Sequence, residues 1–447
     1  MIPFELLIAV SLGVAFLALV RFRPGTFIIA GNQATTLLAL LHFQRYGQPA
    51  SQSFLPGSLF EPRYLEIASN AFAIVTALLV VSVLWRPKKR PPADPRSLPA
   101  VPRPLVWAIL AYFAVAFAYS PTIATSAYEN AAWTIGGVNL GGLNAFLNSL
   151  LIYEAYRRTA LGRWRPWVAA MGVFLLFFCT DYLKGSTGLA SGYIAVGLVL
   201  LLSLERRRGL RLGMLLGAMA AMILVAGLVR SIRQDFHERG SAALDEAWSS
   251  WMGERQGSAQ TAEGIEYQGN GTQYACHVLE CIALYEEGMS RGWRSIVNPV
   301  IYTFEPSFLL EPLGLERPLD APWELGRHYI HGGGIYIVGD LYWNGGYLCV
   351  LLIGLLIVAL AYTCDTRYLS SAGWLMVACQ FSPGLLQGMG YGFAQIFRGG
   401  FNGILAMAMY WLLSRVRTVS GFGPRAGSRG PRAGRASQLL DRAEMGG

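Results

Sequence analysis

Long apolar runs alternate with short polar connections along most of the chain. A bilayer core about 30 Å thick needs roughly 20 apolar residues in a helix, and eleven runs of about that length carry few charges. The pattern predicts an all-α, polytopic membrane protein with about eleven transmembrane helices. The runs cover residues 3–20, 26–43, 66–85, 105–121, 135–153, 167–183, 188–204, 212–229, 346–362, 371–387 and 401–414.

Two of these runs contain groups that are unusual in a span. The second holds Asn32, Gln33 and His42, and the tenth holds Pro383. Polar groups inside a bilayer are costly unless they face the protein interior. We therefore expect these two helices to line the bundle or a cavity.

The spacing of the runs divides the chain into four parts. Residues 1–229 form an N-terminal bundle of about eight helices, interrupted by a Pro-rich basic loop at 86–104. Residues 230–345 form a loop too long to be a turn, and loops of that length are usually functional. Residues 346–414 hold the C-terminal helices. The tail at 415–447 is basic and of low complexity, and we expect it to be disordered.

Composition and charge agree with a membrane protein. Only 14% of the residues are charged, against roughly 25% in soluble domains. A net charge of +9 could indicate nucleic-acid binding, but the basic residues follow the topology. Six connections that alternate along the chain hold 24 of the 36 Lys and Arg residues, namely 21–24, 86–104, 157–165, 205–211, 363–368 and the tail.

Cytoplasmic loops carry an excess of Lys and Arg. The six basic segments are therefore predicted to be cytoplasmic, which places the N-terminus outside and the C-terminus inside. The long loop at 230–345 then faces the outer side. The basic excess is explained by topology, and no nucleic-acid partner is predicted.

The outer loop concentrates groups that could do chemistry. It holds four of the five histidines, and it opens with Arg230 and Arg233, which share one face of a helix. Paired guanidinium groups match phosphate oxygens and stay charged, so this pair is a candidate clamp for phosphate or pyrophosphate. The alternative is that both arginines anchor the helix at lipid headgroups.

A second group of candidates lies where the loop enters the ninth span. Here arginine, histidine and a carboxylate surround a run of glycines, and a histidine or carboxylate beside an arginine could act as a general base on a sugar hydroxyl. The alternative for the glycines is tight turns and helix packing. The candidates are Arg327, His328, His331, Asp340, Tyr342 and Asn344, together with Arg398 in the last outer connection.

Other polar groups of the outer segments are weaker candidates. Residues 274–289 have an amphipathic spacing and predict a helix on the outer membrane surface. Cys276 and Cys281 could form a disulfide in an oxidising compartment, although on one helix they point in different directions. With His277 they lack the usual ligand spacing, so no metal site is predicted. Asp181 and Lys184 could simply pair with each other.

Several short motifs together resemble the O-antigen polymerase (Wzy) family, which is related to the O-antigen ligases. The segment VGDLYWNGGYLCVLLIGLL at 338–356 is similar to the family's pattern after its large periplasmic loop, with Asp340 where Glu is more usual. FEPSFLLEPLGLERP at 304–318 resembles a proline-rich lead-in, and IFRGG at 396–400 resembles a late arginine-glycine element. LKGSTGLASG at 183–192 departs from the family, because it lacks the expected arginine.

The resemblance implies a GT-C-like glycosyltransferase of the bacterial inner membrane that needs no metal or other cofactor. Its donor would be a growing glycan on undecaprenyl pyrophosphate, and its acceptor another lipid-linked repeat unit. Membrane lipid and a chain-length regulator protein are the further partners implied. Two alternatives remain open: a ligase that transfers the glycan to lipid A core, and a flippase or other transporter of lipid-linked oligosaccharide.

In that reaction the candidate residues divide into two groups. Arg230, Arg233 and Arg398 would bind the pyrophosphate. His331, His328 or Asp340 would act on the acceptor hydroxyl. Substrate contacts would come from Arg327, Tyr342 and Asn344.

Overall fold

The structure is a computed structural model, and it consists of two compact units, Met1–Met407 and Ala408–Gly447. The description below concerns the first unit. The residues that the structure describes are 2–21, 23–47, 55–85, 93–119, 134–135, 138–139, 141–179, 187–232, 270–293, 295–297, 321–329 and 334–419.

The described part is all-α apart from one short antiparallel ribbon, so the predicted fold class is confirmed at this level. The ribbon pairs β1 (Thr134–Ile135) with β2 (Val138–Asn139). The helices are α1 (Phe4–Val20), α2 (Pro24–Tyr46), η2 (Gly57–Phe60), α3 (Pro62–Leu84), α4 (Arg103–Tyr119), α5 (Gly141–Ala160), α6 (Pro166–Phe177), α7 (Thr187–Leu202), α8 (Arg208–Ile232), α11 (Asn270–Glu286), α14 (Ala321–Leu325), α15 (Ile337–Arg367), α16 (Ala372–Tyr391) and α17 (Phe393–Val419).

Three of these helices, α2, α3 and α15, are long and apolar enough to cross a membrane. Shorter apolar helices include α1 and α6. The helix bounds follow the predicted runs closely where apolar residues are continuous. The run at 3–20 matches α1 to within one residue, and the run at 66–85 lies in α3 except for its last residue, Trp85. The described part therefore contains three helices that could span a membrane by length and composition. The full set of eleven spans stays a prediction.

Connections that the charge pattern assigns to one side meet at one end of the bundle. The guanidinium group of Arg23, between α1 and α2, donates to the carbonyl of Ser82 at the end of α3, with a 2.9 Å distance. At the same end, the carboxylate of Asp365 near the end of α15 accepts from the backbone N–H groups of Gly25 and Thr26, at 2.8 and 2.9 Å. These bonds satisfy the first N–H groups of α2, which have no acceptor within the helix.

The Pro-rich segment reaches this end as well. The backbone N–H of Ala93 donates to the carbonyl of Leu369, just after α15, and that of Val101 donates to the carboxylate of Glu154 in α5. Arg157 forms a buried ion pair with Glu154 at 2.8 Å. Four predicted cytoplasmic segments thus share one end of the bundle, which we call the basic end. Which side of the membrane it faces stays a prediction.

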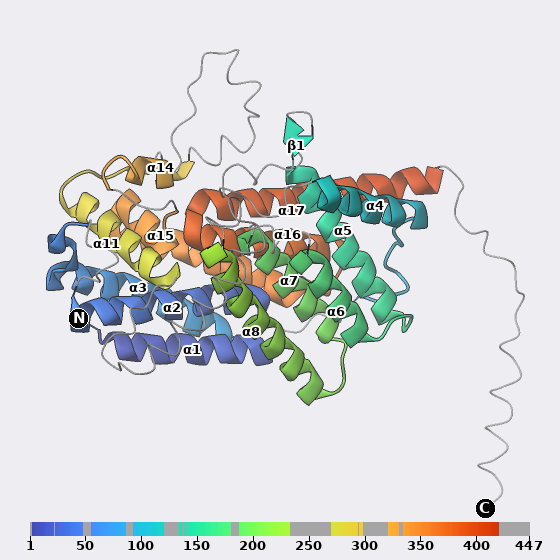
Figure 1. Cartoon of the computed structure of the whole chain (residues 1–447), viewed down its shortest axis with the longest axis horizontal. Helices are drawn as coiled ribbons and strands as arrows, with labels where there is room; N and C mark the ends of the chain where they lie inside the picture. Colours follow the sequence, from blue (N-terminus) through green and yellow to red (C-terminus); the bar gives the residue numbers. More distant parts are fainter. Residues whose placement is uncertain are drawn as a thin grey trace, which may run out of the picture. The chain divides into compact units, whose positions relative to one another are not determined.

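Two groups of helices build the core. α2 packs against α1, α3, α11 and α15, and α16 packs against α5, α7 and α15 (Figure 1). The end opposite the basic end contains the start of α1 and the end of α2, which are joined by an ion pair between Glu5 and Arg45 at 2.7 Å. η2, which precedes the start of α3, contacts α3 and α11 at this end. The start of α15 also lies towards this end, because Asp365 near its other end is bonded at the basic end. We call it the site end.

Close backbone contact at glycine holds α16 against α17. A Cβ atom on Gly384 would lie 2.5 Å from the Cα atom of Gly399, so the two helices meet where neither has a side chain. Small residues allow such close approach between helices in membranes. The same device joins α7 and α16, because a Cβ atom on Gly192 would lie 2.4 Å from the Cα atom of Pro383.

We predict opposite effects for two glycine-to-alanine substitutions. Gly384→Ala should destabilise the protein by about 1–3 kcal/mol, because the new methyl group pushes α17 away. Gly354→Ala should be neutral or should stabilise it by about 0.5–1 kcal/mol, since its Cβ would make an ordinary 3.5 Å contact with Leu78 and alanine favours helix. Thermal unfolding of the purified variants in detergent measures both. Equal stability of the two variants would contradict the prediction.

Candidate functional site

A break in α15 separates a short segment at the site end from the long apolar part of the helix. The helix is interrupted at Gly345 and at Gly346, which has a φ of 61° and a ψ of −153°. A side chain at Gly346 would be strained at that φ, and its Cβ would lie 2.9 Å from the hydroxyl oxygen of Tyr285. The glycine pair is therefore required by the break. The short segment 337–344 carries the predicted residues Asp340, Tyr342 and Asn344.

A buried cluster of charged groups lies on this short segment. The guanidinium group of Arg291, in the chain after α11, contacts the carboxylate of Glu324 in α14 at 2.6 Å and that of Asp340 in α15 at 3.4 Å. The Arg291 side chain is only 8% exposed, and its guanidinium carbon lies 5.2 Å from the centre of the Trp343 ring. The cluster joins three elements that are distant in sequence.

Asp340 accepts from three donors inside the protein. Besides Arg291, its Oδ1 accepts from the side-chain amide of Asn344 at 2.9 Å, and its Oδ2 accepts from the backbone N–H of Phe393 at 2.9 Å. The side chain is 5% exposed. The predicted role of Asp340 as a base on an acceptor hydroxyl does not fit this placement, because its lone pairs already accept three bonds away from the surface.

Tyr342 and Asn344 also point into the protein. Asn344 bonds to Asp340 and accepts a hydrogen bond from the hydroxyl of Ser295, and both Asn344 and Tyr342 are buried. The Tyr342 hydroxyl donates to the carboxylate of Glu286 at 2.9 Å. The predicted substrate contacts of these two side chains are thus replaced by internal bonds that hold α15 against the chain around α11.

Exposed groups lie directly beside the buried cluster. Arg327 and His328, in the turn after α14, are exposed, and the Glu324 side chain is 35% exposed. The imidazole of His328 stands edge-on to the Trp343 ring, with 6.4 Å between centres. Among the described residues near the cluster, these three could contact a ligand while the buried Arg291 and Trp343 fix their surroundings.

The remaining predicted residues are only partly described. Arg230 lies in α8 and Arg398 in α17, and the described part does not extend to their side chains. Arg233 and His331 lie outside the described residues, as do Asp181 and Lys184. Of the described candidates, His328 stands against Trp343 on the segment that carries Asp340, and Arg327 lies next to it in the turn after α14. The predicted arginine clamp stays a prediction.

The helix α11 differs from its prediction. Instead of lying on a surface, it is buried from Ala275 to Leu284 and packs against α2, α3 and α15. Cys276 and Cys281 are buried free thiols, and burial raises the pKa of each. The possible disulfide between them is absent from this helix.

Glu280 of α11 is a buried carboxyl that the amphipathic pattern places on the polar face. It is fully buried, and neither of its oxygens has a hydrogen-bond partner in the described part of the chain. Burial raises its pKa to about 8, so the carboxyl holds a proton at neutral pH. The nearby Tyr329 hydroxyl is also affected, because burial and then the charges of Glu287 and Glu280 raise its pKa to about 12.

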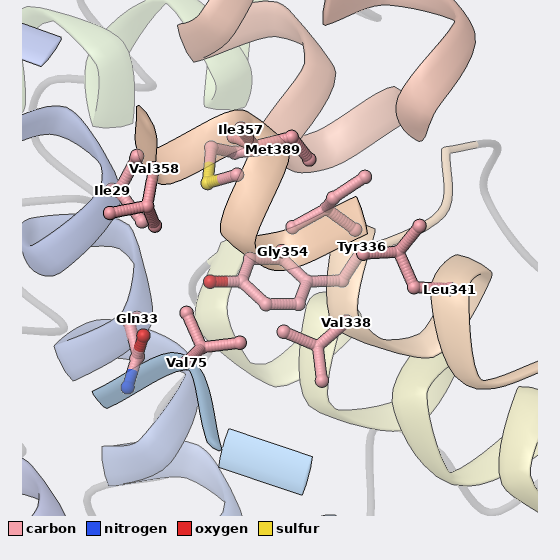
Figure 2. A pocket seen from close by; sticks show the side chains of 11 residues that line it. Ile29, Gln33, Val75, Tyr336, Val338, Leu341, Gly354, Ile357, Val358 and Met389 are labelled. Atoms are coloured by element: carbon pink, nitrogen blue, oxygen red, sulfur yellow. The ribbon is translucent and has the colours of Figure 1, made fainter. Parts of the chain in front are cut away.

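A small cavity of about 20 Å³ lies inside the bend of α15 (Figure 2). Val338 before the break and Val358 after it both line the cavity, with Gln33 of α2 and Met389 of α16. Gln33, one of the polar residues of the second predicted run, therefore lines a cavity, whereas Pro383 of the tenth run does not line it. The Gln33 side-chain oxygen has no partner among the described residues, and the cavity has room for about one water molecule.

Sequence reasoning missed Arg291, Glu324 and Glu280. Each is one of many charged residues in the outer segments, and nothing in their local spacing separates them from surface charges. Only the contact between α11, α14 and α15 distinguishes them. No family model matches the sequence, and neither a curated protein nor a solved structure matches it.

Proposed function

We propose that the chain is a membrane glycosyltransferase of the O-antigen polymerase type. It transfers a growing glycan from undecaprenyl pyrophosphate to a sugar hydroxyl of another lipid-linked repeat unit. The observation that supports this best is the exposed group of His328, Arg327 and Glu324 at the end of the bundle opposite the basic connections. Glu324 of this group is bound by the buried Arg291, which also contacts Asp340.

The proposed reaction replaces pyrophosphate by the acceptor hydroxyl at the anomeric carbon. The acceptor oxygen forms a bond to that carbon, the bond to pyrophosphate breaks, and undecaprenyl pyrophosphate leaves with the electron pair. His328 takes the proton of the acceptor hydroxyl, because it is the exposed imidazole of the described site. Negative charge develops on the leaving pyrophosphate, and Arg327 with the predicted Arg230, Arg233 and Arg398 stabilises it.

A purified-component assay tests the proposal. Protein in nanodiscs, supplied with lipid-linked repeat units, should form a ladder of longer chains. His328→Ala should reduce the rate by about 100-fold or more, as expected for loss of a general base. His42→Ala is the matched control. His42 is a histidine of α2 at the same end of the bundle, three residues before Arg45 of the Glu5–Arg45 ion pair, and it lies outside the proposed site. An unchanged rate for His328→Ala would refute its role.

The same assay separates the alternatives. With lipid A core added as acceptor, a ligase would form a conjugate with the core and no ladder. A transporter would form neither product. Arg230→Ala and Arg233→Ala should each shorten the chains, and full chain length in both variants would remove the clamp from the proposal.

A further inference from the structure

The turn between α16 and α17 is fixed from two sides by the segment that begins α15. The backbone N–H of Ile335 donates to the carbonyl of Gly390 at 2.9 Å, and Asp340 accepts from the N–H of Phe393 at 2.9 Å. Gly392, between them, has a φ of +84°, and a Cβ atom there would lie 2.6 Å from Oδ2 of Asp340. The carboxylate therefore reaches the start of α17 only because Gly392 has no side chain.

This bond supplies a cap that α17 cannot supply itself. The first N–H groups of a helix have no acceptor within it, and an anion near them is favourable because of the helix dipole. An N-cap side chain usually accepts from the second or third amide of a helix. Here the residue before α17 is Gly392, whose carbonyl accepts from the N–H of Gln395 at 3.2 Å. The first amide, that of Phe393, takes its acceptor from outside the helix. Asp340 of α15 takes this role from a neighbouring helix.

Arg291 fixes the carboxylate that makes the cap. It contacts Oδ1 of Asp340, which leaves Oδ2 for Phe393. A buried carboxylate needs such a cation, since an unpaired charge inside a protein is costly. On its other side Arg291 contacts Glu324 at 2.6 Å, so the cap is connected to the exposed group of the site.

We propose that Asp340, held by Arg291, is a positioning residue that sets the first turns of α17 and thereby the place of Arg398. Arg398 lies five residues after Phe393, in the second turn of this helix. The assignment of Arg398 to pyrophosphate rests on the proposed function, whereas the cap on α17 does not. Asp340 itself touches no substrate.

The first test follows the cap directly. Hydrogen exchange of the full-length protein should show the amide of Phe393, the one bonded to Asp340, exchanging at least 10-fold faster in Asp340→Ala than in the wild type. Asn344→Ala is the matched control, because it removes a donor to Oδ1 and leaves the Oδ2 bond to Phe393. It should leave the amide of Phe393 protected. Unchanged exchange in Asp340→Ala, or equal acceleration in both variants, would overturn the cap.

The second test asks whether the cap acts through Arg398. Inorganic pyrophosphate, used as a competing ligand, should bind at least 10-fold more weakly to Arg398→Ala and to Asp340→Ala. The double variant should lose no more than Arg398→Ala alone, because both changes remove one interaction. Asp340→Asn keeps the size and one acceptor oxygen and should show an intermediate loss.

The outcomes separate this inference from the proposed function. If the loss of pyrophosphate affinity in the double variant equals the product of the two single losses, the positioning role is overturned. If Arg398→Ala binds pyrophosphate as the wild type does, the pyrophosphate assignment fails, and the action of Asp340 through Arg398 fails with it. Faster exchange at Phe393 would then still establish the cap as a structural contact only.

Discussion

Replacing Glu280 by glutamine should stabilise the protein, and the gain should grow as the pH rises from about 5 to 8. The pKa of this carboxyl is about 8 in the folded protein because burial disfavours its charged form, whereas in the unfolded chain it is near the ordinary value of 4.5. Between these values the folded state holds a proton that the unfolded state releases. Folding stability due to Glu280 is therefore fully present below about pH 4.5 and is lost as the pH rises towards 8.

The expected effect is several kcal/mol at pH 8, since each pH unit between the two pKa values corresponds to about 1.4 kcal/mol. Glutamine has a similar shape and does not ionise in either the folded or the unfolded state. It removes this part of the pH dependence and keeps the packing of α11 against α15.

Thermal unfolding at a series of pH values measures the effect. The control is Glu287→Gln, because Glu287 follows α11 and is exposed. The wild type and Glu287→Gln should lose stability with rising pH in parallel, while Glu280→Gln should fall less steeply. Parallel curves for all three proteins would show that Glu280 is not a buried acid in the folded state.

The sequence predicted the helices where one physical signal dominates. Continuous apolar residues defined α1, α3 and the long part of α15, because a span must satisfy its backbone and cover it with apolar side chains. Charge counting grouped the connections that the structure brings to the basic end. Arg23 and Asp365 show why, since each satisfies backbone groups at helix ends there.

The site was harder to predict because its residues depend on contacts between distant segments. The glycines at the start of a helix mark Asp340 and Asn344 as candidate site residues. A carboxylate that caps another helix has the same local sequence as one that contacts a substrate, so the sequence cannot distinguish the two roles. Arg291 has no local signal at all, since its partners are 33 and 49 residues away.

The helix α11 illustrates a different failure. An amphipathic spacing normally indicates one buried face and one exposed face. Here α11 is surrounded by α2, α3 and α15, so Glu280 on the polar face is buried as well. Periodicity cannot reveal this, because it reports the character of a face and not what covers it.

Replacing Arg291 by methionine should destabilise the protein by about 3 kcal/mol or more. Removing one partner of a buried ion pair leaves the other charge uncompensated, and this cost exceeds the value of the pair itself. In Arg291→Met, the buried Asp340 loses its cation while Met preserves most of the apolar contact with Trp343. Glu324 loses its partner too, but it is partly exposed and water can replace the contact.

A double variant identifies the buried charge as the cause. Asp340→Asn in the Arg291→Met background should recover much of the lost stability, because a neutral amide needs no cation and can still accept from the N–H of Phe393. Arg327→Met is the control, since Arg327 is an exposed arginine of the same site. The thermal unfolding temperature of Arg327→Met should be close to that of the wild type. If the double variant is less stable than Arg291→Met alone, Arg291 stabilises the fold through Trp343 and Glu324 and not by compensating Asp340.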